Sequence, residues 1–178
     1  MNGICRNKWF PIRVTYGREL KFQQYLRKFQ IESFIPMQYK QQVSKDGKRR
    51  KVLVPAVNNL CFVHSTKEKL DEIRAGLYAT LPVHYIWDRG TGVPIVVPDK
   101  AMEDFIKVSS TFDENLVYMS DVSPVLRAGQ RVKVTAGPFK GIEGTVVRIK
   151  KTRRVMVELP GMLALASAYI PSYWLETV

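Results

Sequence analysis

The sequence predicts an α+β protein of two domains, a four-stranded antiparallel sheet with helices followed by a small curled β-barrel. Up to residue 108, apolar spacing switches between strand and helix periods in the order β-α-β-β-α-β-α. Residues 109–127 have no sustained period and carry Ser, Asp, Asn and Pro, as linkers do. Three short alternating segments then follow within 129–159, with glycines between them. We therefore predict domains at 1–108 and 128–178 joined by a linker.

The first domain opens with a strand at Trp9–Tyr16, where apolar residues recur at every second position. Arg18–Gln30 follows as an amphipathic helix, because Phe22, Tyr25, Leu26 and Phe29 fall on one face. Two strands, Phe34–Ser44 and Arg49–Val54, are predicted to form a hairpin around Asp46-Gly47. Three further strands are predicted at Leu60–His64, Val83–Trp87 and Ile95–Val97. Two more helices are predicted. One begins at the capping box Ser65–Glu68 and buries Leu70, Ile73 and Leu77. The other begins at Pro98-Asp99 and buries Met102, Phe105 and Ile106.

The second domain begins with alternation over Gln130–Thr135, and further strands are predicted at Thr145–Ile149 and Val155–Leu159. Lys150–Arg154 is predicted to be a charged turn between the last two. Gly144 stands where a bulge or a close approach of another backbone is expected. Three short strands in so few residues indicate a curled sheet or barrel.

The charge of the chain favours a polyanionic partner. The 178 residues contain 28 Lys and Arg against 16 Asp and Glu, a formal net charge of +12. Residues 1–108 carry 19 basic and 10 acidic groups, and residues 128–178 carry 8 and 3, so both predicted domains are basic. Such a surface attracts phosphate polymers in a salt-dependent manner. The alternative is a solvated surface that happens to be basic.

Several classes of protein are not supported. No apolar run reaches the roughly 18–20 residues that span a bilayer, and the first ten residues lack the apolar core of a secretory signal. Cys5 and Cys61 fit no metal-binding spacing, and the two histidines, His64 and His84, have no ligand partners nearby. Gly137–Gly141 lacks the Lys-Ser/Thr ending of a phosphate-binding loop. We therefore expect a cytoplasmic protein without membrane contact, which is not an enzyme and needs no cofactor or metal.

Five short motifs, in this order and spacing, resemble the NusG family of transcription elongation factors. They are Trp9-Phe10 with Gly17, Glu32–Pro36, Asn58–Val63, Gly137–Phe139 and Tyr173–Glu176. The resemblance implies an N-terminal NGN domain and a C-terminal KOW domain of the SH3-like β-barrel fold. The segment Ala164–Pro171 is similar to the specialised UpxY-type antiterminators of capsule loci, which have a role like that of RfaH.

The resemblance implies a function as well as a fold. The N-terminal domain would dock on the clamp helices of RNA polymerase, contact DNA of the elongation complex and suppress pausing or termination, in the manner of an operon-specific factor for polysaccharide genes. The KOW domain would recruit a ribosomal protein or Rho, and the protein is expected to be a monomer. Some such paralogues refold this domain as a helical hairpin, but the valine-rich strands here favour a stable barrel.

Two sets of candidate site residues follow from the resemblance and the charge. The predicted polymerase-binding residues are Phe10, Val57, Asn58, Asn59, Leu60, Tyr85 and Ile86. The general factors have aromatic residues and Pro-Gly at the positions of residues 57–60. Ordinary core packing is the alternative for the apolar members, and for Phe10 and Leu60 the two interpretations have equal weight. The predicted nucleic-acid-binding residues are Arg13, Arg18, Lys21, Lys28, Lys48, Arg49 and Arg50, for which solvated surface is the alternative.

A ribosome-associated KOW protein that binds RNA is the competing hypothesis, since a basic barrel serves both functions. The distinguishing feature is an exposed apolar surface on the first domain, which has no evident use in binding RNA.

Overall fold

The computed structural model describes residues 6–119, 129–149 and 151–178, which form two compact units. Unit 1 runs to Pro36 and resumes over Val57–Asp99. Unit 2 contains Met37–Ala56 and the chain from Lys100 onward. The predicted α+β class is confirmed: helices accompany antiparallel sheets, and the C-terminal part is β-rich.

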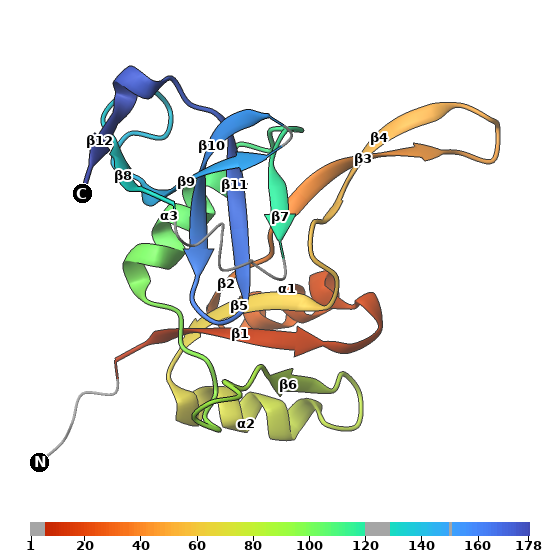
Figure 1. Ribbon diagram of the computed structural model, residues 1–178. Coiled ribbons are helices and arrows are strands. Elements are labelled where there is room, and N and C mark those ends of the chain that lie inside the picture. Colours follow the sequence, from red (N-terminus) through yellow and green to blue (C-terminus); the bar gives the residue numbers. More distant parts are fainter. Residues whose placement is uncertain (1–5, 120–128, 150) are drawn as a thin grey trace, which may run out of the picture. The chain divides into compact units, whose positions relative to one another are not determined.

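Unit 1 is built on a four-stranded sheet with the strand order β2-β5-β1-β6 (Figure 1). The strands are β1 (Lys8–Val14), β2 (Glu32–Phe34), β5 (Leu60–Ser65) and β6 (Val83–Tyr85). The central pair is antiparallel, in register from Lys8↔Ser65 to Arg13↔Leu60. Most residues of β1 and β5 are buried at consecutive positions, so both faces of the sheet centre are covered.

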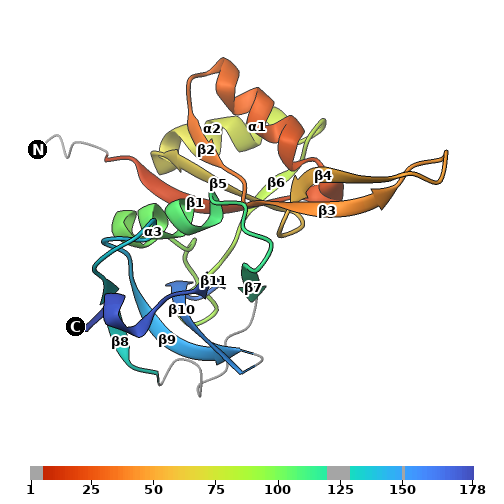
Figure 2. The same ribbon diagram turned by 90° about the horizontal axis from the view of Figure 1, so that it is seen from above.

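Two helices of unit 1 lie on the same side of this sheet (Figure 2). Helix α1 (Glu19–Lys28) follows the short 3-10 turn η1 (Thr15–Gly17) and buries Phe22 and Leu26. Helix α2 (Lys67–Leu77) starts at the predicted cap, where the Thr66 hydroxyl accepts from the Lys69 N–H at 3.3 Å. It buries Leu70, Ile73 and Leu77, as predicted. Phe29 was predicted to lie on the buried face of α1, but it is 52% exposed because the helix ends one residue before it.

The segment between β6 and residue 99 contains isolated bridges in place of the strand predicted at Ile95–Val97. The bridges join Trp9 to Val97 and Trp87 to Pro94. Pro94 and Pro98 flank the segment and lack the N–H that a continuous ladder needs, which accounts for its short pairing.

Unit 2 contains the predicted hairpin, made of β3 (Met37–Val43) and β4 (Arg49–Pro55). Its register runs from Met37↔Pro55 to Val43↔Arg49, and the turn uses Gly47 at a φ of 76°. These strands pair only with each other and extend away from the rest of unit 2 (Figure 1). The prediction had the second strand begin at Phe34; a break at Ile35-Pro36 instead divides it into β2, which joins the sheet of unit 1, and β3.

The rest of the sheet structure of unit 2 is a six-stranded antiparallel sheet with the order β12-β8-β9-β10-β11-β7. Its strands are β7 (Val117–Met119), β8 (Arg131–Val134), β9 (Glu143–Ile149), β10 (Thr152–Leu159), β11 (Leu163–Tyr169) and β12 (Leu175–Thr177), with η2 (Ser172–Trp174) before the last. The predicted close approach at Gly144 is confirmed, since a Cβ there would lie 2.4 Å from the Met156 carbonyl oxygen.

Part of the predicted linker belongs to unit 2. Strand β7 pairs with β11, and the Arg154 guanidinium donates to the carbonyl oxygens of Ser167, at 2.8 Å, and Asn115. Three residues are too few to show a period, so the sequence did not predict β7. Residues 120–127 of the predicted linker lie outside the described residues, and the proposed domain boundaries stay a prediction.

Helix α3 (Asp99–Ser109) belongs to unit 2 from Lys100 onward and buries the predicted Met102 and Phe105, while Ile106 is half-buried. The buried Asp104 carboxylate accepts from Lys100 at 2.6 Å and from the Glu143 N–H at 3.3 Å. Within the described part of the chain, no helix is long and apolar enough to cross a membrane.

Candidate functional site

Three residues predicted to bind polymerase belong to the core of unit 1. Phe10, Leu60 and Tyr85 are only 3%, 4% and 4% exposed. Phe10 and Leu60 lie on the two central strands, where both faces are covered, and the Phe10 ring meets the edge of Tyr85 at 5.7 Å. The prediction that these side chains form an exposed apolar surface is therefore wrong.

The loop before β5 has a different environment, and its Asn59 is held by the fold. Val57 is half-buried, whereas Asn58 and Asn59 are exposed. The Asn59 backbone N–H donates to the buried Glu19 carboxylate, and its side-chain oxygen accepts from the Gly17 N–H at 3.0 Å. Its φ of 61° lies in the left-handed region, which asparagine tolerates better than most residues. Asn59 therefore fixes this loop against the start of α1.

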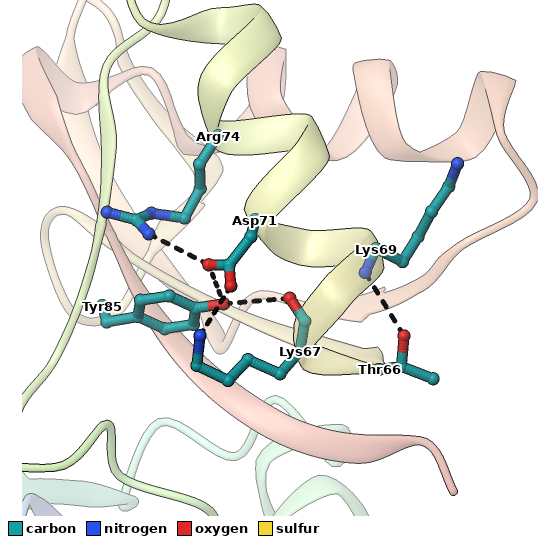
Figure 3. Close-up of polar contacts among 6 residues, drawn as sticks. All are labelled: Thr66, Lys67, Lys69, Asp71, Arg74 and Tyr85. Carbon is teal, nitrogen blue, oxygen red and sulfur yellow. Dashed lines mark hydrogen bonds and ion pairs between the residues drawn. The ribbon is translucent and has the colours of Figure 1, made fainter. Parts of the chain in front are cut away.

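The hydroxyl of Tyr85 connects β6 to α2 in a polar cluster (Figure 3). It donates to the Asp71 carboxylate at 2.9 Å, and the same carboxylate accepts from Lys67 at 2.6 Å and Arg74 at 3.2 Å. The Arg74 guanidinium also lies 4.4 Å from the centre of the Tyr85 ring. Burial is the main cause of the raised pKa of Tyr85, and the hydrogen bond to Asp71 is the second cause. The pKa of Asp71 is lowered, mainly by its hydrogen bond from the Lys67 ammonium. Tyr85, which was predicted to contact polymerase, therefore links β6 to α2 within unit 1.

Exposed apolar residues of unit 1 directly follow Tyr85 and Ile86 of the predicted set in the chain. Ile86 is half-buried, but Trp87, Val93 and Val96 are 53%, 54% and 41% exposed. We call residues 86–96 the Trp87 loop. In the sequence, a tryptophan beside a glycine-rich turn could have indicated this exposed loop. We instead assigned Trp87 to the strand predicted over Val83–Trp87.

Hydrogen bonds hold the Trp87 loop in one conformation. The Ile95 N–H donates to the Ile86 carbonyl and the Asp88 N–H to the Val93 carbonyl, both at 2.9 Å. The Asp88 carboxylate accepts from the N–H groups of Gly90 and Thr91 at 2.8 Å, and these bonds lower its pKa. The loop therefore presents its apolar side chains in a fixed arrangement.

The predicted nucleic-acid contacts in unit 1 are mostly exposed. Arg13 lies on β1, and Lys21 and Lys28 lie on α1, seven residues apart and hence on the same side of the helix. Arg18 differs, because it is half-buried, donates to the Thr80 carbonyl at 3.2 Å and lies 5.4 Å from the Tyr16 ring centre.

The other predicted nucleic-acid contacts lie at the tip of the hairpin in unit 2. Lys48, Arg49 and Arg50 are exposed, and Arg50 has a loose ion pair with Asp46 at 3.7 Å. The Ser44 N–H and the Lys48 carbonyl close the turn at 2.9 Å. The turn thus gathers several cations on a two-stranded arm with few core contacts.

The titratable groups within the described residues form no metal-binding arrangement of three or more His, Cys, Asp or Glu side chains. Burial raises the pKa of the Cys61 thiol, which disfavours the reactive thiolate. The His64 ring stacks on Trp9 with centroids 4.7 Å apart and bonds Glu32 at 2.7 Å. That the protein is not an enzyme stays a prediction.

Comparison with known proteins identifies the family. The family model described as "Transcription termination factor nusG" matches residues 7–106, more than half of the chain, and the KOW motif matches residues 128–158. No curated protein matched. Among solved structures, one titled "Domain interaction in Thermotoga maritima NusG" is 19% identical, with 99% of each chain covered and a TM-score of 0.49. Because the NusG match covers more than half of the chain and the KOW match covers β8, β9 and nearly all of β10, the chain belongs to the NusG family of transcription factors.

Proposed function

We propose that this protein is a transcription elongation and antitermination factor that binds RNA polymerase through unit 1. It suppresses pausing or termination and serves particular operons, such as those for polysaccharide biosynthesis. The barrel recruits a further protein, for which a ribosomal protein or Rho is the expected class. Family membership supports the general role, and the exposed apolar Trp87 loop is the observation that carries the polymerase contact.

The Trp87 loop has the properties of a docking surface. Tryptophan is among the residues that contribute most to binding energy at protein interfaces. Trp87, Val93 and Val96 place exposed apolar area on one short segment, which the fold of unit 1 leaves uncovered. Because backbone bonds already order the loop, docking loses little conformational entropy.

The polymerase contact is tested by equilibrium binding of the full chain to purified RNA polymerase. Trp87→Ala combined with Val96→Ala should weaken binding about 30-fold, the equivalent of about 2 kcal/mol for an interface tryptophan. Tyr78→Ala is the matched control, because Tyr78 is 77% exposed in unit 1 outside the loop. Equal affinity of the loop variant and the control would remove the Trp87 loop from the interface.

The function itself is tested by transcription of a template with a pause site and a terminator. The wild-type chain should increase run-through, and the Trp87 loop variant should lose this effect. Run-through unchanged by the wild-type chain, on templates from several operons, would contradict the antitermination role. Binding to ribosomes without binding to polymerase would instead favour the ribosome-associated alternative.

The nucleic-acid contacts of unit 1 and of the hairpin complete the proposal. Lys21 and Lys28 on α1, and Lys48 to Arg50 on the hairpin, contact the phosphate backbone of DNA in the elongation complex. Replacing Lys48, Arg49 and Arg50 with Gln should reduce the slope of log affinity for duplex DNA against log salt by about 3. A slope equal to that of the wild-type chain would show that the hairpin touches no phosphates.

A further inference from the structure

A cavity of about 240 Å³ lies between the β3–β4 hairpin and the segment 112–118, both within unit 2, and the proposed function does not use it. The side chains that matter for its chemistry are Tyr39, Gln41 and Lys51 of the hairpin, and Phe112, Asp113 and Glu114 of the segment. Its volume is below the roughly 300 Å³ at which ligand pockets usually begin, so it suits a single large side chain.

Two aromatic rings form one wall of this cavity. The rings of Tyr39 and Phe112 meet edge to face with their centroids 6.1 Å apart, and the two residues are 46% and 38% exposed. Phe112 has a φ of 50°, in the left-handed region that bulky residues rarely adopt. The backbone is therefore strained at the residue whose ring packs beside Tyr39.

The charged groups of the lining are two carboxylates and one ammonium, from Asp113, Glu114 and Lys51. The Asp113 Oδ1 atom accepts from the backbone N–H and the side-chain amide of Asn115, at 2.8 and 2.9 Å. This net negative lining belongs to a chain whose formal net charge is +12. Carboxylates beside aromatic faces attract a cation.

Lys51 shows how the cavity holds a cation. Its ammonium forms an ion pair with Glu114 and lies 5.9 Å from the centre of the Tyr39 ring. The side chains of Lys51 and Glu114 are 54% and 60% exposed, so water screens their attraction and the pair adds little stability. Another cation can therefore displace Lys51 from Glu114 at a small cost.

A guanidinium group fits these walls better than an ammonium group. It is planar, forms two parallel hydrogen bonds with one carboxylate and stacks on aromatic rings. It is also more weakly hydrated, so it loses less on leaving water. A metal ion is disfavoured, because the described residues contain no cluster of three or more His, Cys, Asp or Glu side chains that could hold one.

The free edge of β3 indicates how an arginine reaches the cavity. Among the described residues, β3 has β4 as its only partner strand. The Ser44 N–H bonds the Lys48 carbonyl next to the pair Val43↔Arg49, and bonded pairs alternate along an antiparallel ladder. This alternation directs the backbone N–H and C=O groups of Tyr39 and Gln41 away from β4. An extended peptide can add to such an edge through main-chain hydrogen bonds.

From this arrangement we infer that the cavity binds an arginine side chain of a partner protein, carried on an extended segment that pairs with β3. The guanidinium takes the place of Lys51 at Glu114 and stacks on the rings of Tyr39 and Phe112. The segment is otherwise uncharged towards the hairpin tip, because the exposed cations of residues 48–50 would repel a second one. This site is separate from the Trp87 loop and from the proposed DNA contacts.

The site is tested by fluorescence anisotropy of the full chain with a short peptide in which one arginine is flanked by alternating threonine and valine. Citrulline in place of the arginine keeps the shape and removes the charge, and it should weaken binding about 10-fold. Glu114→Gln and Phe112→Leu should each weaken binding of the arginine peptide about 5- to 10-fold. Methylation of the peptide nitrogens that face β3 should weaken it about 10-fold as well.

Lys51→Gln gives the sharpest test, because the proposal predicts a gain. Removal of the internal competitor should strengthen binding of the arginine peptide about three- to fivefold. The matched controls are Lys40→Gln and Asp46→Asn, which change exposed charges of the same hairpin that do not line the cavity. Their affinities should stay within about twofold of wild type, since salt screens distant surface charges.

Nuclear magnetic resonance locates the bound arginine. Its δ-methylene protons should shift upfield through the ring currents of Tyr39 and Phe112, and the shift should decrease in Phe112→Leu. Equal affinity for the arginine and citrulline peptides, or a Lys51→Gln variant that binds no tighter than wild type, would overturn the proposal. Thermal unfolding of each variant, expected close to wild type, excludes misfolding as the cause of a change. Because neither polymerase nor DNA is present, the outcome is independent of the tests of the proposed function.

Discussion

Strands β4 and β5 are consecutive in the chain, and the structure uses them in opposite ways. Strand β5 has a partner on each side, β2 and β1, and five of its six residues are buried. Strand β4 has a single partner, β3, and none of its residues is buried. In this pair, the strand with two neighbours uses its side chains for the core, whereas the strand of the free hairpin keeps them for solvent.

The largest expected effect comes from the same substitution in both strands. Leu60 on β5 is 4% exposed and Leu53 on β4 is 42% exposed. Leu60→Ala should lower the free energy of unfolding by about 2–5 kcal/mol, because it removes buried methyl groups and leaves a cavity. Leu53→Ala should change it by about 1 kcal/mol or less, since part of the side chain is already in water. Urea denaturation of the two variants measures both values.

Comparable losses in the two variants would contradict the assignment of Leu60 to the core. A small loss for Leu60→Ala, combined with weaker polymerase binding, would restore the exposed surface predicted from the sequence.

A smaller effect is expected in the loop that joins the two strands. Asn59 has a positive φ and accepts the Gly17 N–H, whereas its exposed neighbour Asn58 has neither feature. Asn59→Ala should destabilise the protein by about 1–2 kcal/mol, because alanine is strained in the left-handed region and leaves that N–H without its acceptor. Asn59→Gly should cost less, because glycine removes the strain, and Asn58→Ala should stay within about 0.5 kcal/mol.

Thermal unfolding of Asn59→Ala, Asn59→Gly and Asn58→Ala measures how much each substitution lowers the stability. Equal destabilisation by Asn58→Ala and Asn59→Ala would show that neither the backbone conformation nor the Gly17 contact stabilises this loop.

The sequence predicted most elements of both units and less of the interaction surface. Helix α2 and hairpin β3–β4 were predictable because a capping box and an Asp-Gly turn are local signals. The sequence left the burial of Phe10 and Leu60 open, since it depends on which strands become neighbours in the sheet. Trp87 was overlooked for a related reason: β6 ends at Tyr85, two residues before the predicted end, and this places Trp87 in a loop.

The smallest expected effect compares two carboxylates, Asp71 on α2 beside the core sheet and Asp46 at the hairpin tip. Both have a lowered pKa, Asp71 chiefly through the Lys67 ammonium and Asp46 chiefly through the Ser44 hydroxyl. A carboxyl with a lowered pKa in the folded state stabilises the fold above its unfolded pKa of about 3.9, and this contribution is lost as the pH falls through the folded value.

Asp71→Asn should therefore lower the free energy of unfolding at pH 7, by less than about 1 kcal/mol because the side chain is 40% exposed and screened by solvent. The difference between variant and wild type should shrink below pH 4 and vanish once the wild-type carboxyl is protonated. Asp46→Asn should have a smaller effect than Asp71→Asn over the same range, because solvent screens the Asp46 carboxylate at the exposed hairpin tip. Urea denaturation at pH 7, 4 and 2.5 measures these differences. A pH-independent effect of Asp71→Asn would mean that the shape of the side chain, and not its charge among Lys67, Arg74 and Tyr85, links β6 to α2.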